Sequence, residues 1–215
     1  MSRGNKIMII VMTALLVAAV IGEVITYRYG NEQRNGIGKE EIASLELALL
    51  DEYGYDDETE MKELGFETTD QLVLKVFGSE EVEDGVIRVY GYEYDSQFVN
   101  FKGKAYDLRG GLGPVVVDVK KDGDNIKIVK LYGDKATTDE EYEMMPEDYR
   151  KRAQNFEGKA SDTLSPDMNS RVEKALGVQV DEQYDLRIDG DKYQIYEYTD
   201  DVNVIDEGKL SDVDR

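Results

Sequence analysis

A glycine-rich run near the middle of the chain is the first stretch whose residue types could do chemistry. It reads Arg109-Gly110-Gly111-Leu112-Gly113-Pro114. Glycines let an anionic group approach backbone N–H groups, and an arginine beside them adds positive charge. The residues that follow favour a strand, however, whereas a phosphate-binding loop opens a helix. Arg109, Gly110 and Gly111 are therefore candidate ligand contacts, and a flexible turn or bulge before a strand is the alternative interpretation.

Tyrosine is the second candidate, because the chain contains 15 of them. Tyr90, Tyr92 and Tyr94 alternate in twos, which places them on one face of a predicted strand. Tyr132 lies at the end of a later predicted strand. Half-buried sheet faces favour tyrosine and explain the pattern without a ligand. The sharper hypothesis is that Tyr90, Tyr92, Tyr94 and Tyr132 contribute to an aromatic ligand-binding surface.

Two aspartate-rich turns resemble fragments of calcium-binding loops. They read Asp122-Gly123-Asp124-Asn125 and Asp189-Gly190-Asp191. Both lack the third acid and the glutamate at position twelve that a complete loop needs. Hairpin turns therefore explain them, with weak divalent-cation binding by the acidic surface as a further expectation. The repeated turn also leaves an internal duplication open.

The absence of histidine and cysteine excludes many enzyme classes. A chain without these residues has no Ser-His-Asp triad, no thiol nucleophile, no disulfide and no ordinary zinc site. Carboxylate pairs stay available, because residues 29–215 hold 46 of the 47 acids. None of these acids stands out in an apolar setting, so we predict no catalytic residue, no cofactor and no metal ligand.

The net charge of −21 bears on the class of partner. Phosphate backbones recruit lysine and arginine, so the charge argues against nucleic acid. It argues equally against anionic lipid and anionic wall polymers. Cationic partners, divalent ions or simple solubility fit better.

An apolar run at the N-terminus predicts the location of the rest of the chain relative to the membrane. Residues Ile7 to Tyr27 are apolar except for Glu23 and follow Arg3 and Lys6. At about 1.5 Å per residue this run reaches about 30 Å, the hydrocarbon thickness of a bilayer. We expect residues 1–29 to be a single-pass membrane anchor with a cytoplasmic N-terminus, or alternatively a cleaved signal peptide. Either way the bulk of the chain is extracytoplasmic.

The remaining chain predicts an α+β fold, in which helices pack on a curved antiparallel sheet. Residues 30–38 form a tether, residues 39–199 an extracytoplasmic domain with a division into 39–156 and 165–199 as an option, and residues 200–215 a loosely held acidic tail. We expect the sheet to be built from Val86 to Tyr132.

Helices are expected at 39–53, from about 56 to 64, at 69–77, at 138–156 with a break at Pro146, and from a cap at Ser165 with Pro166 in the first turn. Strands are expected from Val86 to Tyr94, after a break at Asp95-Ser96, and in two hairpins that turn at residues 122–123 and 189–190.

A resemblance to a known family covers about residues 90–153. The order YGYEYDSQF, GGLGPVVVDVKKDGDNIKIVKLYG and MMPEDYRKRA resembles an uncharacterised extracytoplasmic module of Gram-positive membrane-anchored proteins. That module also occurs beside membrane metallopeptidases of the β-lactam-sensing type. Since this chain has no histidine, no catalytic residue carries over. The resemblance implies an accessory sensing or binding domain outside the membrane.

Taken together, the sequence predicts a non-catalytic, membrane-anchored extracytoplasmic domain that binds or senses an unknown ligand. Its expected partner is a protein at or outside the membrane. Two alternatives stay open: a peptidase inhibitor or chaperone-like module, and a carboxylate-dependent cell-wall hydrolase.

Overall fold

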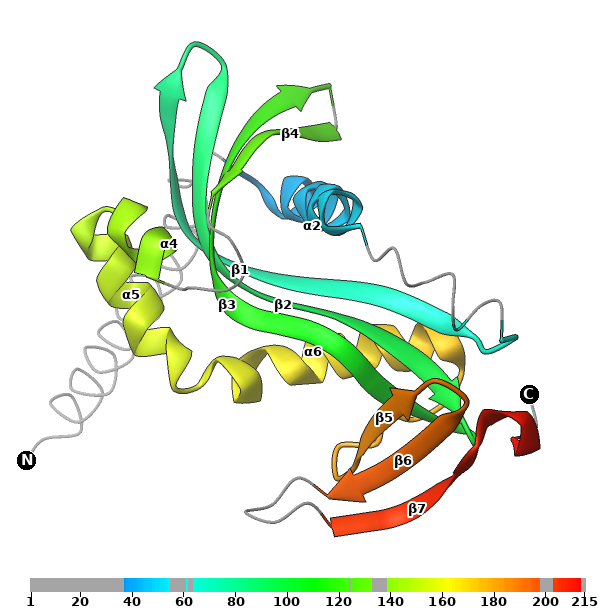
Figure 1. Ribbon diagram of the computed structural model, residues 1–215. Helices are drawn as coiled ribbons and strands as arrows, with labels where there is room; N and C mark the ends of the chain where they lie inside the picture. The colour runs from blue at the N-terminus through cyan, green and yellow to red at the C-terminus, as the bar shows by residue number, and fades with distance from the viewer. Residues whose placement is uncertain are drawn as a thin grey trace, which may run out of the picture.

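The computed structural model describes residues 37–54, 61, 64–123, 125–132, 139–197 and 203–213. Within them the chain forms helices and two antiparallel sheets, which confirms the α+β class (Figure 1). The larger sheet has the strand order β1-β2-β3-β4 and the smaller one β5-β6-β7. Most of residues 1–38 and of the short helix expected from about residue 56 lie outside this description. None of the helices in the described part is long and apolar enough to cross a membrane.

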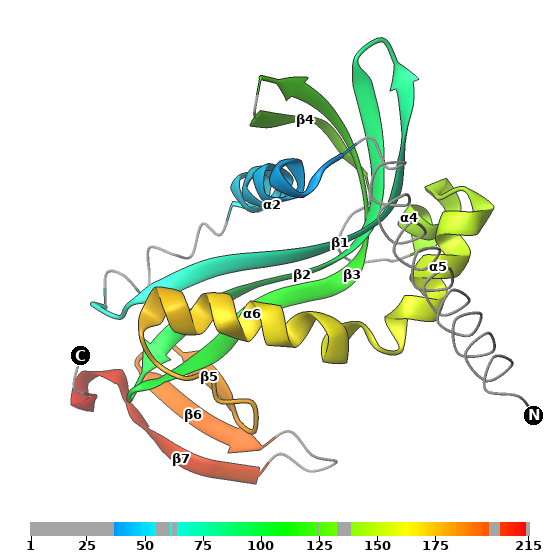
Figure 2. The same ribbon diagram turned by 180° about the vertical axis from the view of Figure 1, so that it is seen from behind.

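The large sheet consists of long, bent strands. Its members are β1 (Thr68–Glu83), β2 (Val86–Phe101), β3 (Lys104–Asp122) and β4 (Asn125–Tyr132). Helix α2 (Lys39–Tyr53) covers one face and α6 (Ala160–Leu176) the other (Figures 1 and 2). The short helices α4 (Asp139–Met144) and α5 (Glu147–Glu157) lie where the sheet bends. Because both faces are covered, its strands carry continuous apolar runs rather than a simple alternation.

The prediction of a helix at residues 69–77 is wrong, since this segment belongs to strand β1. Leu72 and Leu74 pack under α2, whereas Val73 packs on the opposite face toward α6. A short apolar run fits both helical and strand periodicity, and here burial on both faces decides for the strand. Gly78 does not end a helix but follows an irregularity in the pairing with β2.

Two predicted interruptions of the sheet are also wrong. Strand β2 continues through Asp95 and Ser96, which are 1% and 0% exposed. The glycine-rich run is part of strand β3 rather than a turn before it. Polar residues can stay inside these strands because partners are within reach: the Ser96 hydroxyl lies 2.8 Å from the backbone oxygen of Arg109.

Helix α2 binds both outer edges of the large sheet. The Glu46 carboxylate accepts a 2.9 Å hydrogen bond from the backbone N–H of Leu74 on β1. The Ser44 hydroxyl accepts one of 2.9 Å from the backbone N–H of Ile126 on β4. The helix ends at Gly54, whose φ of 47° is left-handed, as the sequence predicted.

Helix α6 begins earlier than predicted. The sequence placed its cap at Ser165, but the helix starts at Ala160 and contains Pro166 in its interior. Its buried residues are spaced by four and form one stripe: Ala160, Leu164, Met168 and Val172. Burial of this stripe against the sheet outweighs the hydrogen bond that the proline cannot donate. The break at Pro146 between α4 and α5 is confirmed.

The small sheet contains β5 (Asp185–Asp189), β6 (Lys192–Glu197) and β7 (Asn203–Lys209). The hairpins at residues 122–123 and 189–190 are confirmed by the pairing of their strands. The prediction of a loosely held tail is wrong, since β7 pairs with β6 and a 3₁₀ turn (Leu210–Asp212) follows. Leu210 and Val213 are buried in the cluster that joins the small sheet to Phe101. The described part of the tail, residues 203–213, is therefore part of the fold.

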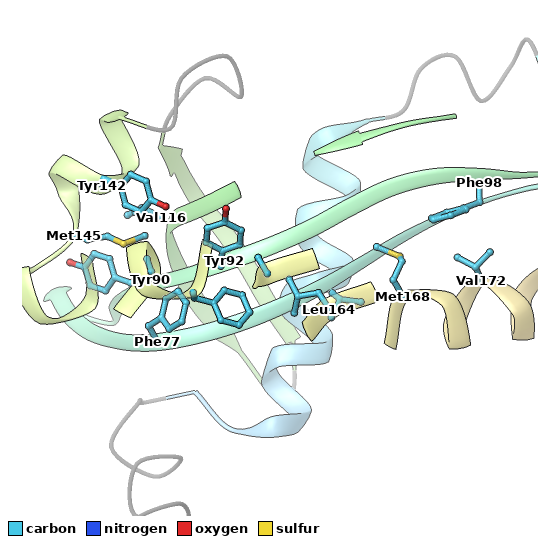
Figure 3. Close-up of a cluster of buried hydrophobic side chains, with 14 of the residues drawn as sticks. Phe77, Tyr90, Tyr92, Phe98, Val116, Tyr142, Met145, Leu164, Met168 and Val172 are labelled. Carbon is cyan, nitrogen blue, oxygen red and sulfur yellow. The ribbon is translucent and has the colours of Figure 1, made fainter. Parts of the chain in front are cut away.

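The largest core cluster lies between the large sheet and helices α4 to α6 (Figure 3). A second cluster lies under α2 and starts at Ile37, within the predicted tether. The third joins the end of the large sheet to the small one. Helix α6 and the small sheet thus both pack on the large sheet.

Candidate functional site

A cavity of about 610 Å³ lies between α6, strands β2 and β3, and the segment that leads into β5. We call it the Asp107 cavity. Concave sites that combine rings with converging polar groups are the usual places for ligands. The residues that line it are Tyr94, Phe98, Asp107, Ser161, Asp162, Ser165, Pro166, Asn169, Val180, Asp181, Glu182, Tyr184 and Asp185.

A shift in strand pairing brings the sheet residues of this cavity together. The register of β2 and β3 slips between Gln97 and Phe98, so that Asp107 pairs with Phe98. Its carboxylate accepts hydrogen bonds from the hydroxyls of Ser96 at 2.5 Å and Tyr94 at 3.1 Å. The slip is therefore the local feature that places a carboxylate beside a tyrosine at the wall of the cavity.

Burial dominates the electrostatics of this wall. It raises the pKa of Asp107 although Ser96 and Tyr94 donate to the carboxylate, and the negative charge of Asp185 raises it further. The pKa of the Tyr94 hydroxyl is also raised, first by burial and then by Asp107. A cation beside Asp107 would offset the cost of the buried negative charge on this carboxylate.

Helix α6 supplies the opposite wall. Ser161 and Ser165 are one turn apart and their hydroxyls lie 3.4 Å from each other. Asn169, a further turn along, donates a 2.5 Å hydrogen bond to Glu182. The spacing of four places all three on one side of the helix, facing the segment that enters β5.

The segment before β5 is fixed to the end of β3. The backbone N–H of Ala105 donates to Gln179 at 2.8 Å, and that of Asp181 donates to Ala105 at 2.9 Å. Val180 thereby forms an isolated parallel bridge with Ala105. Lys104 lies 3.7 Å from Asp181, at one end of the cavity. These contacts give the acidic segment a defined position.

The lining is strongly acidic. Five of its described residues are carboxylates, namely Asp107, Asp162, Asp181, Glu182 and Asp185, and none is lysine or arginine. Such walls raise the local concentration of cations and disfavour anions. No group of three or more potential metal-binding side chains within the described part is arranged to hold an ion. The weak divalent binding expected from the sequence stays a prediction.

The predicted tyrosine face divides between core and cavity. Tyr90 and Tyr92 are 1% and 3% exposed and belong to the largest cluster (Figure 3). The Tyr90 ring packs on Tyr149 with centroids 5.3 Å apart. Both rings belong to the core, and we place neither in the binding site. Tyr94, two residues further, is the member of this face that reaches the cavity.

The glycine-rich candidates lie on β3 beside the buried middle of β2. Arg109 pairs with Gln97, Gly110 with Ser96 and Gly111 with Asp95. A Cβ atom on Gly110 would lie 2.1 Å from the backbone oxygen of Asp95. Close packing of two strands therefore requires this glycine, whatever its part in binding.

Tyr132 lies in a polar cluster at the end of β4 and packs against the same core cluster as Tyr90 and Tyr92. Its hydroxyl accepts from Arg88 at 2.6 Å and donates to Asp118 at 2.7 Å. The Arg88 guanidinium and the Lys130 ammonium lie 4.7 and 4.1 Å from its ring centroid. The Arg88 hydrogen bond holds the pKa of Asp118 below its usual range. These contacts explain Tyr132 as a link between strands.

Most residues of the cavity were not candidates in the sequence. The acids of α6 and of the β5 approach belong to a chain with 47 acids, so no single one stood out. The one signal in the sequence is the Ser165-Pro166 pair, which predicts a helix cap and which lies at the cavity wall.

Comparisons with known proteins identify no relative: no protein-family model, no curated protein and no solved structure matches this chain. The resemblance of residues 90–153 to a Gram-positive extracytoplasmic module therefore stays a prediction.

Proposed function

We propose that this chain is a membrane-anchored extracytoplasmic domain that binds a positively charged ligand in the Asp107 cavity. One observation carries the ligand class, namely the five carboxylates that converge on the cavity with no lysine or arginine among its described lining. The apolar run at residues 7–27 supports the location.

The cavity favours an organic cation over a bare ion. Tyr94, Phe98 and Tyr184 give it ring surface, whereas Ser161, Ser165 and Asn169 offer neutral hydrogen-bonding groups. An ammonium or guanidinium group on an alkyl chain uses both kinds of surface, because its charge is attracted to carboxylates and its stem packs on rings.

The binding test uses the full chain in detergent micelles and two small probes of equal length. We expect 1,5-diaminopentane to shift the amide signals of Tyr94, Asp107, Asn169 and Asp185 in NMR spectra, and pentane-1,5-diol to leave them unchanged. Asp185→Asn should weaken binding of the diamine, and Glu83→Gln, an exposed acid on β1 far along the sheet, should not. Equal shifts by both probes, or none by either, would contradict the proposal.

The location is tested separately. We expect the full chain, expressed in a bacterial host, to fractionate with membranes and to be digested by protease added to intact cells. Recovery as an undigested protein in the cytosol would contradict the extracytoplasmic placement.

A further inference from the structure

A second cavity, also of about 610 Å³, lies across strands β5, β6 and β7 of the small sheet. We call it the Arg187 cavity. Its charged and amide side chains are Arg187, Asp189, Lys192, Gln194, Glu207 and Lys209. They stand at alternate positions of strands that pair in register, so they share one face of the sheet. Unlike the Asp107 cavity, this one is therefore lined by cations as well as acids.

The three cations of the Arg187 cavity form no ion pair with any other residue in the described part of the chain. Lys192 lies directly opposite Lys209 in the pairing of β6 with β7. Like charges at such positions destabilise a sheet. Glu207, one of the two acids, accepts a 3.2 Å hydrogen bond from the amide of Gln194. An anionic group bound among the cations would offset their repulsion.

Strand β5 connects this cavity to the Asp107 cavity. Its residues alternate between exposed and covered positions, and Asp185 and Arg187 both lie on the exposed face. Asp185 lines the Asp107 cavity, and its charge raises the pKa of the Asp107 carboxyl. Arg187, two residues further, lines the second cavity. Since two residues of a strand span about 7 Å, an acidic site and a site with three cations lie next to each other.

We propose that one small dipolar molecule occupies both cavities, with an ammonium group in the Asp107 cavity and a carboxylate group among Arg187, Lys192 and Lys209. This inference rests on the function proposed above and names the class of its ligand. A guanidinium binds a carboxylate through two parallel hydrogen bonds, and the two ammonium groups add positive charge. The reversed orientation places like charges together, so the pair of cavities also fixes the direction of the ligand.

Two probes of equal length test the carboxylate end. They are 6-aminohexanoate and 6-aminohexanamide, which has the same ammonium but no negative charge. In NMR titrations of the full chain in detergent micelles, we expect the acid to bind about fivefold more tightly than the amide. The acid should shift the backbone amide signals of Asp185 and Asn169 in one cavity and of Lys192 and Lys209 in the other.

A matched pair of variants separates the Arg187 cavity from the general charge of the protein. Arg187→Gln should remove the advantage of the acid without weakening binding of the amide, because the ammonium site is unchanged. Lys120→Gln removes an exposed cation of β3 outside both cavities and should preserve the advantage. Equal loss in both variants would overturn the inference.

The remaining outcomes distinguish this inference from the proposed function. Equal binding of 6-aminohexanoate and 6-aminohexanamide would overturn the inference, and the cationic-ligand function would stand, because both probes carry the ammonium. Hexanoate carries the carboxylate alone. If it binds as tightly as 6-aminohexanoate, the Arg187 cavity is a separate anion site and the single dipolar ligand is wrong. If neither 1,5-diaminopentane nor the two amino probes shift signals of the Asp107 cavity, the proposed function fails as well.

Discussion

Arg171 on α6 meets Glu46 on α2 across the outer edge of β1, with 2.8 Å between Nη1 and Oε2. The same guanidinium donates to the backbone oxygen of Leu72 at 2.8 Å. Glu46 in turn accepts from the N–H of Leu74. One ion pair therefore links helices on opposite faces of the sheet and satisfies the strand edge between them.

Loss of this pair should destabilise the fold. Arg171→Met keeps most of the stem but leaves the buried Glu46 carboxylate without its cation. Since the arginine is partly exposed, we expect a cost of about 2 kcal/mol, below that of a fully buried pair. Urea unfolding of the full chain measures it. Lys151→Met, which removes an exposed pair with Glu147 on α5, should cost less than about 0.5 kcal/mol. Equal effects of the two variants would contradict the edge-binding role.

Gly78 on β1 makes room for the aromatic ring of Tyr149, which belongs to α5. A Cβ atom there would lie 2.2 Å from Cζ of Tyr149. We expect Gly78→Ala to cost about 2 kcal/mol, because the ring must move from its contact with Tyr90. Thermal unfolding in a double-mutant cycle with Tyr149→Ala should show most of this cost disappear. Gly158→Ala serves as control, since nothing lies within 4 Å of its Cβ position. A cost that persists without the ring would mean that the backbone is responsible.

The raised pKa of Asp107 predicts a pH dependence of stability. An acid whose pKa is higher in the folded state contributes stability that is complete below its unfolded value, about 3.9. That contribution is lost as pH rises through the folded pKa. We therefore expect the free energy of unfolding to fall from about pH 4 upward, and Asp107→Asn to reduce this slope. Urea unfolding across this range is the measurement. An unchanged slope in the variant would contradict the assignment to Asp107.

Asp118 should behave in the opposite way. Its pKa is lowered by the Arg88 hydrogen bond, so its contribution is present above the unfolded value and lost as pH falls through the folded one. Asp118→Asn should therefore reduce the loss of stability in acid, below about pH 4, without altering the change above it. Unfolding curves at acidic pH measure this. A variant that loses stability on acidification as steeply as the parent would contradict it.

The C-terminal tail should be necessary for stability. Leu210 is 2% exposed and packs with residues of both sheets. Leu210→Ala should cost about 3 kcal/mol through lost burial and the cavity left behind. Val204→Ala, at an exposed position of β7, should cost less than about 0.5 kcal/mol. Urea unfolding distinguishes the two, and a neutral Leu210→Ala would restore the loosely held tail that the sequence predicted.

Local signals in the sequence were sufficient for elements whose ends carry strong backbone preferences. The α2 helix ends at Gly54, the α4–α5 break falls at Pro146, and the turn at Gly190 joins β5 to β6, all as predicted. In each case one residue type decides the backbone conformation without reference to the rest of the molecule.

Elements that depend on burial from two sides were mispredicted. Strand β1 is apolar on both faces, so its run at Leu72 to Leu74 fits a helix equally well. Helix α6 continues through Pro166 because its stripe at every fourth residue is buried. The site was missed for a related reason: Asp107, Asp162 and Asp185 are far apart in the sequence, and only the register shift and the docking of α6 bring them together.

The position of Ser44 and Glu46, two residues apart on one helix, has a consequence for proteolysis. A cut that released α2 would uncover amide groups at both ends of the strand order at once. A molecule whose β1 and β4 edges are both exposed can pair with one neighbour at each edge. Such pairing gives an open-ended polymer rather than a closed dimer. Removal of the fifteen-residue helix α2 is therefore expected to favour edge-to-edge association of this sheet.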